Sequence, residues 1–98
     1  MTKKNINFSD KVTQNNDILV KKLDNSAVIL NLNNDTYYGI NETSYSMYKK
    51  LIKSNSIEQA FIKICSEFDA EPNIIKNDLI EFVQDLLNNK VIILEHNE

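Results

Sequence analysis

Few residues of this sequence carry side chains that commonly do covalent or metal chemistry. There is one cysteine, Cys65, one histidine, His96, and one glycine, Gly39. One histidine and one cysteine cannot supply the three or four ligands of a zinc site, and no paired base would activate the Cys65 thiol. A single glycine cannot build a phosphate-binding loop or a nucleophile elbow. We therefore expect Cys65 to be a buried inert thiol and His96 to be solvated, and we predict no catalytic site, no metal and no cofactor.

Three acidic residues, Asp78, Glu81 and Asp85, recur at helical spacing near the C-terminal end. Charged residues at this spacing usually form the solvated outer face of a helix. The alternative is a docking surface for a partner, and the sequence leaves both interpretations open.

Aromatic residues and the only glycine meet in the stretch NNDTYYGINETSYSMY, residues 33–48, where a strand-like pattern changes to a helix-like one. Adjacent strand residues point to opposite faces, so at most one of Tyr37 and Tyr38 enters the main core. The other is either a half-exposed cross-strand packing residue or an anchor for a ligand that lies along the strand. Gly39 indicates a bulge or a close approach of another backbone.

Three strands are predicted ahead of this junction. The runs with strand-like composition are ILVKKL (18–23), AVILNL (27–32) and TYYGI (36–40). Turn-forming residues at 24–26 and 33–35 separate them, which predicts an antiparallel meander whose first and third strands are its edges. In the second run Val28, Leu30 and Leu32 share one face, because strand side chains alternate.

Three helices follow the strands. They are predicted to begin at an Asn41 cap, at a capping box formed by Ser56 and Gln59, and at Pro72 in a first turn. A short apolar segment at 90–95 ends the chain as a strand or an extended tail. The fold class is therefore α+β, with a three-stranded antiparallel meander followed by three helices and a short C-terminal extended segment.

The first 17 residues are polar and without period, which predicts a flexible N-terminal arm ahead of a domain spanning 18–95. The apolar residues of this arm, Ile6, Phe8 and Val12, either dock on the domain or become ordered only with a partner. On this interpretation, truncation before about Asp17 leaves a folded domain.

Charge and composition exclude some classes of protein. All eleven basic residues are lysine, and residues 56–98 carry nine acids against three lysines. Nucleic-acid-binding proteins usually present a basic face with arginine side chains that make bidentate contacts. We therefore predict no nucleic-acid partner. No run approaches the roughly 18 apolar residues that a membrane helix needs, and we predict no membrane partner. One cysteine and no signal peptide favour the cytoplasm.

The sequence resembles the PqqD family from about residue 17 to 94. The most specific match is Tyr-Tyr-Gly-Ile-Asn-Glu-Thr at 37–43, where relatives have a strand ending in Tyr-Tyr-Gly-Leu-Asn-Glu-Thr-Gly; SIEQAFIKICSEFD and IEFVQDLLNNKVI match mainly in apolar spacing. The sequence departs from the family pattern at Ser44, Tyr45 and Tyr48. Lys90 stands where a glycine usually follows the third helix, so an asparagine, such as Asn89, is expected to take the left-handed cap.

The resemblance implies a small winged helix-turn-helix-like domain that recognises the leader of a ribosomally made precursor peptide. Relatives add the leader as an antiparallel strand beside the third strand and pass it to a modifying enzyme, such as a radical S-adenosylmethionine enzyme, or to a leader protease. This chain is expected to act as a separate protein. The candidate peptide-binding residues are Thr36, Tyr37, Tyr38, Gly39, Lys76, Leu79, Ile80 and Val83.

The faces of the third helix, the edge strand and the function each have alternatives. On the third helix, Phe82 and Leu86 are expected on the core side, and Leu79 on either side. Tyr37 is the favoured residue with backbone groups directed outward. The alternative functions are a winged-helix DNA-binding regulator and an assembly protein that forms a homodimer through the exposed edge.

Overall fold

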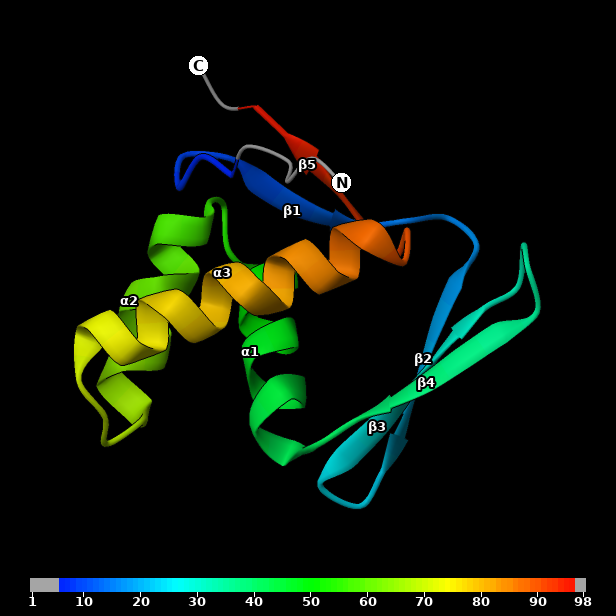
Figure 1. Cartoon of the computed structure of the whole chain (residues 1–98), viewed down its shortest axis with the longest axis horizontal. Helices are drawn as coiled ribbons and strands as arrows, with labels where there is room; N and C mark the ends of the chain where they lie inside the picture. Colours follow the sequence, from blue (N-terminus) through cyan, green and yellow to red (C-terminus); the bar gives the residue numbers. More distant parts are fainter. Residues whose placement is uncertain (1–5, 97–98) are drawn as a thin grey trace.

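The computed structural model describes residues 6–96, and residues 1–5 of the predicted arm lie outside the described residues (Figure 1). The elements in chain order are β1 (Lys11–Gln14), β2 (Ile18–Leu23), β3 (Ser26–Asn31), β4 (Thr36–Ile40), α1 (Glu42–Lys53), α2 (Ile57–Glu67), α3 (Pro72–Asn88) and β5 (Ile92–Glu95). The predicted α+β class is confirmed, with its three-stranded meander, three helices and C-terminal extended segment.

The meander is an antiparallel sheet with strand order β2-β3-β4. Its first turn is shorter than predicted, because Asp24 takes a left-handed conformation with φ 54° and β3 begins at Ser26. The core face of β3 holds Ala27, Ile29 and Asn31, which are all buried. The face shared by Val28, Leu30 and Leu32 is therefore turned away from the core.

α1 packs on the core face of this sheet, α2 packs against α1 and α3, and α3 crosses in front of α1 and α2 in Figure 1. The predicted starts hold, because the Asn41 side chain accepts a hydrogen bond from the Ser44 N–H at 2.9 Å and the Ser56 side chain accepts one from the Gln59 N–H at 3.2 Å. Pro72 lies in the first turn of α3.

The core side of α3 differs in part from the prediction. The fully buried residues of this helix include Leu79, Val83 and Leu86, whereas Phe82 is only half-buried. The apolar stripe of α3 is wide, and a wide stripe does not by itself tell which of its two flanks faces solvent. Leu86 is on the core side as predicted, whereas Phe82 only packs against the margin of the core.

The predicted flexible arm is wrong for residues 11–14, which form β1 and pair antiparallel with β5 as a second sheet. Val12 is 1% exposed and lies opposite Leu94. Backbone carbonyls of Phe8 and Asp10 accept hydrogen bonds from the N–H groups of Glu58 and Ile57 at 2.9 Å each. These are N–H groups of the first turn of α2, which has no partner for them within the helix. The N-terminal segment is thus part of the packed domain.

The C-terminal end of α3 is closed by Lys90 rather than by Asn89. Lys90 has φ 59°, whereas Asn89 has φ −91°. The Val91 N–H donates to the Leu86 carbonyl at 2.9 Å and the Lys90 N–H donates to the Leu87 carbonyl at 3.1 Å. This pair of bonds is the Schellman arrangement, and it holds Lys90 left-handed despite its side chain. The cap directs the chain from α3 into β5.

Within residues 6–96, no helix combines the length and apolar character needed to cross a membrane.

Candidate functional site

β4 forms one edge of the three-stranded sheet. It pairs with β3 on one side, and no strand in the described part of the chain pairs with its other side. The strand contains no charged residue and no proline, which are the devices that natural edge strands commonly use against further pairing. Its free side is therefore suited to receive another strand.

The backbone groups that face outward follow from one hydrogen bond in the neighbouring ladder. The Leu32 N–H donates to the Asp17 carbonyl at 2.8 Å, so these residues form a hydrogen-bonded pair. Such pairs alternate with non-hydrogen-bonded pairs along an antiparallel ladder, and both ladders of this sheet keep a continuous one-to-one register. The even-numbered residues of β3 therefore bond to β2, and its odd-numbered residues bond to β4.

Within β4, the odd-numbered residues Tyr37 and Gly39 direct their N–H and C=O groups away from the sheet. Their even-numbered neighbours lie opposite odd-numbered residues of β3 and bond to that strand. This parity agrees with the prediction for Tyr37. The continuous register excludes a bulge at Gly39, which lies directly opposite Val28.

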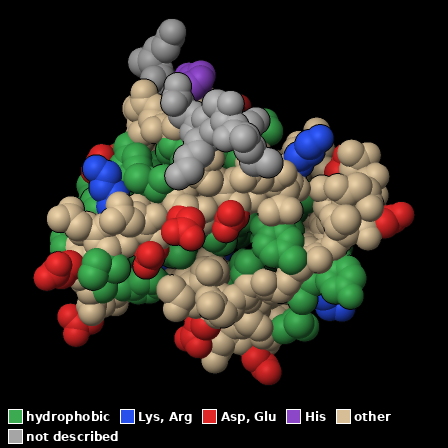
Figure 2. All heavy atoms as spheres, viewed as in Figure 1, with side chains coloured by type: hydrophobic (Ala, Val, Ile, Leu, Met, Phe, Trp, Pro, Cys, Tyr) green, Lys and Arg blue, Asp and Glu red, His purple; other side chains and the backbone are tan. Residues whose placement is uncertain are grey.

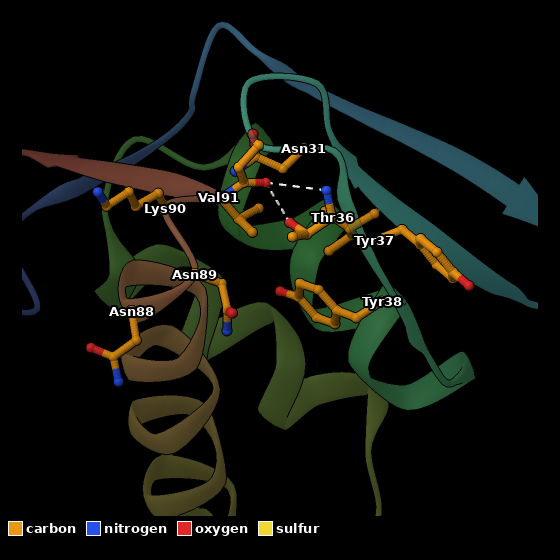
Figure 3. Close-up of a pocket in the computed structure, with 10 residues that line it drawn as sticks. Asn31, Thr36, Tyr37, Tyr38, Asn88, Asn89, Lys90 and Val91 are labelled. Atoms are coloured by element: carbon orange, nitrogen blue, oxygen red, sulfur yellow. Dashed lines mark hydrogen bonds between the residues drawn. The ribbon is translucent and has the colours of Figure 1, made fainter.

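The side chains of the two tyrosines leave β4 in opposite directions. Tyr37 is 74% exposed, whereas Tyr38 is half-buried and directs its ring toward the end of α3 (Figure 3). The Cβ position on Gly39 is open, because the nearest atom to an added Cβ is the Ala27 carbonyl oxygen at 4.0 Å. An added side chain at Gly39 would therefore meet no close neighbour on that face of the sheet.

A groove of about 420 Å³ lies between β4 and the C-terminal end of α3. We call it the edge groove, and its lining residues are Ile29, Asn31, Asn34, Thr36, Tyr37, Tyr38, Asn88, Asn89, Lys90 and Val91. One wall comes from the strand and the other from the helix cap (Figure 3). The Thr36 N–H and hydroxyl both donate to the Asn34 side-chain oxygen, at 3.2 and 2.5 Å, which fixes the start of β4.

The Tyr38 hydroxyl is buried and has no hydrogen-bond partner among the described residues. Burial, and to a lesser degree the negative charge of Asp85, raise the pKa of Tyr38 from 10.0 to about 12. Burial and then the neighbouring Tyr38 also raise the pKa of Tyr48, whose hydroxyl donates to the Gln14 side chain. Both phenols are therefore neutral at physiological pH.

A second depression, of about 280 Å³, lies between the start of α1 and the middle of α3. We call it the acidic depression, and its lining residues are Asn41, Thr43, Ser44, Met47, Asp78, Glu81, Phe82 and Asp85. The acidic side chains gather along α3 near the centre of the face shown in Figure 2. It adjoins the edge groove, because the Asn89 side chain of the groove donates to the Asp85 backbone carbonyl at 2.8 Å.

The structure brings together the strand half of the predicted site but not its helix half. Thr36, Tyr37 and Tyr38 line the edge groove, and Gly39 continues the same strand. Of the four α3 residues predicted to flank the ligand, none lines either depression; they are Lys76, Leu79, Ile80 and Val83.

These four residues do not line the depressions because α3 is rotated about its axis so that other side chains face β4 and α1. Leu79 and Val83 are fully buried in the core. Lys76 lies on the opposite flank, where its ammonium group stands 5.4 Å from the centre of the Phe8 ring, and Ile80 is half-buried one turn further on. The flank of α3 beside β4 carries the acids and Phe82 instead. The helical spacing of the acids is visible in the sequence, but spacing alone does not show that they line this wall.

Neither of the residues considered first for chemistry joins this site. Cys65 is half-buried rather than buried and packs against the core. The His96 ring is largely exposed, with its Nδ1 2.7 Å from a carboxylate oxygen of the buried Asp10. In the described part of the chain, no three histidine, cysteine or acidic side chains gather as a metal site would require.

Comparison with known proteins places this geometry in a family. The family model of PqqD, described as coenzyme PQQ synthesis protein D, matches residues 26–92. The match covers well over half of the chain, and the chain belongs to the PqqD family. No curated protein sequence matches it.

Two solved structures share the fold. One is lasso peptide synthetase B1 complexed with the leader peptide, with a TM-score of 0.77 and 20% identity over 85% of this chain and 98% of that chain. The other is TbiB1 in complex with the TbiA(beta) leader peptide, with a TM-score of 0.76 and 21% identity over 82% of this chain and 93% of that chain. At such identities the likeness demonstrates the common architecture.

Proposed function

We propose that this protein is a non-catalytic binding protein that recognises the leader of a ribosomally made precursor peptide. The leader adds to the sheet as a strand beside β4 and is then delivered to a modifying enzyme or a leader protease. The observation that carries the proposal is the outward direction of the Tyr37 and Gly39 backbone groups along an unguarded edge.

An added strand gains affinity from main-chain hydrogen bonds and sequence preference from the pockets beside it. The β4 edge offers both, because Tyr37 and Gly39 supply donors and acceptors and the edge groove lies directly alongside. A bound strand would place alternate side chains toward α3 and toward the solvent side of Tyr37.

Membership of the PqqD family and the fold shared with two leader-bound proteins support this assignment. The partner enzyme is proposed to be a radical S-adenosylmethionine enzyme or a leader protease, acting in the cytoplasm, where a lone thiol such as Cys65 remains reduced. Chemistry on the precursor would belong to that enzyme.

Amide hydrogen exchange on the whole chain tests the proposal. The probe is a linear peptide selected for binding to this chain from a random library, added in excess. We expect the amides of Tyr37 and Gly39 to become protected, because only these N–H groups of β4 point outward. Tyr38 and Ile40, which already bond to β3, serve as internal controls with little change. Peptide binding without protection of Tyr37 and Gly39 contradicts the proposal.

A further inference from the structure

The edge groove and the acidic depression follow one another along β4 and into the start of α1, and their charges differ. The acidic depression contains Asp78, Glu81 and Asp85, whereas the edge groove contains one charged residue, Lys90. A ligand that spans both meets negative charge at one end and a positive charge at the other.

The three acids have no cationic partner in residues 6–96. The ion pairs of this part of the chain join Lys50 to Glu67 and His96 to Asp10, and no lysine lines the acidic depression. The half-buried Phe82 and the buried Met47 of α1 line the same depression. Carboxylates next to apolar side chains suit a long cationic side chain, which packs its methylene stem on the apolar groups and keeps its charged end among the carboxylates.

The direction of the added strand determines which end of the leader meets the acids. An antiparallel strand beside β4 runs from Ile40 toward Thr36. Its N-terminal part therefore lies near Asn41 and the acidic depression, and its C-terminal part lies near Lys90.

The register of the added strand also determines which of its side chains face α3. Residues directly opposite each other in an antiparallel pair send their side chains to the same face. Leader residues opposite Tyr38 and Ile40 therefore point toward α3, because Tyr38 does so and Ile40 is buried. Those opposite Tyr37 and Gly39 point to the other face.

We propose that the acidic depression selects a lysine or arginine in the N-terminal half of the bound leader segment, on the side-chain set that faces α3. This inference rests on the proposed function and specifies the chemistry of its ligand. Lys90 at the opposite end disfavours a second cation there, so that charge fixes the direction of the bound strand as well as its sequence.

Selection from a random linear-peptide display library tests the inference with defined probes. The wild-type chain is compared with the triple variant Asp78→Asn, Glu81→Gln and Asp85→Asn. The matched control carries Glu58→Gln, Asp69→Asn and Glu71→Gln, which neutralise three exposed acids outside both depressions. We expect wild type and control to enrich peptides with a basic residue at one N-terminal position, and the triple variant to lose that enrichment.

Affinities of one recovered peptide complete the test. Replacing its basic residue by methionine is expected to weaken binding to wild type about tenfold, the range of a charge-assisted contact, and to leave binding to the triple variant unchanged. Recovered peptides that protect Tyr37 and Gly39 but show no basic preference overturn this inference alone. If no peptide protects those amides, the proposed function fails as well.

Discussion

Tyr37 and Tyr38 are neighbours in β4, yet only Tyr37 directs its backbone groups outward, while only Tyr38 directs its ring toward α3. One residue thus offers main-chain bonds to an added strand, and the next contributes a wall of the edge groove. The two roles are separable by substitution.

Proline substitution distinguishes the outward N–H of Tyr37 from the N–H of Tyr38, which bonds to β3. Tyr37→Pro removes an outward N–H and is expected to weaken leader binding about tenfold, because one or two hydrogen bonds are lost. Its thermal midpoint should stay close to that of the control Tyr37→Val, which keeps the N–H. Tyr38→Pro instead removes a hydrogen bond to β3 and leaves its acceptor without a partner, which should lower the free energy of unfolding by about 1–3 kcal/mol. Equal leader affinity for Tyr37→Pro and Tyr37→Val would show that the edge does not receive the peptide.

Gly39→Ala should stabilise the free protein. Gly39 does not occupy the left-handed region, and an added Cβ has the Ala27 carbonyl oxygen as its nearest atom, at 4.0 Å. Replacing a glycine in a compatible conformation restricts the unfolded chain and raises the free energy of unfolding by about 0.4–1 kcal/mol. Urea denaturation measures this change, and a decrease would mean that the glycine relieves a contact in the folded state.

Tyr38→Phe removes a buried hydroxyl that has no partner among the described residues. Because an unpaired buried hydroxyl is costly, the phenylalanine variant is expected to be equally stable or more stable by about 1 kcal/mol. Tyr48→Phe is the contrasting control, since the Tyr48 hydroxyl donates to Gln14 and its removal should be destabilising. A loss of stability in Tyr38→Phe would indicate a hydrogen bond to water or to a nearby group.

The Tyr38 phenol should also make the free energy of unfolding fall in alkaline solution. The pKa of Tyr38 is about 12 in the folded chain, compared with the ordinary 10.0, so above pH 10.0 the unfolded chain releases a proton that the folded chain retains. This contribution is fully present below pH 10.0 and is lost as pH rises through about 12. Denaturant titrations across this range should show a shallower decline for Tyr38→Phe than for wild type. Parallel curves for the two proteins would contradict the assignment.

The elements with local signals could be predicted from the sequence, and those set by distant partners could not. Asn41, Ser56 and Pro72 are start signals that lie within a few residues of the helices they begin, and all three hold. β1 has a single buried residue, Val12, and its partner β5 lies at the other end of the chain, so alternation gives no usable pattern.

The candidate site could likewise be predicted from the sequence only where its residues carry a local signal. The edge strand was identified from its own residues, but the wall across from it depends on the rotation of α3 in the core. Phe82 and Val83 are adjacent and both apolar, and only packing decides that Val83 is buried while Phe82 lines the acidic depression. The outward parity of Tyr37 likewise depends on the pairing of Leu32 with Asp17, a contact between separate strands.

The structure assigns the N-terminal segment to the packed domain. Val12→Ala should lower the free energy of unfolding by about 2 kcal/mol, because it removes buried methyl groups opposite Leu94. The matched control in the same two-stranded sheet is Ile93→Ala, whose side chain is 45% exposed and should cost much less. Deleting residues 1–14 removes β1 and also the carbonyls of Phe8 and Asp10 that accept from the first turn of α2. Cooperative unfolding should therefore be lost in the deletion variant, as followed by circular dichroism during thermal denaturation. A cooperative transition at the wild-type midpoint in that variant would restore the interpretation of this segment as a dispensable arm.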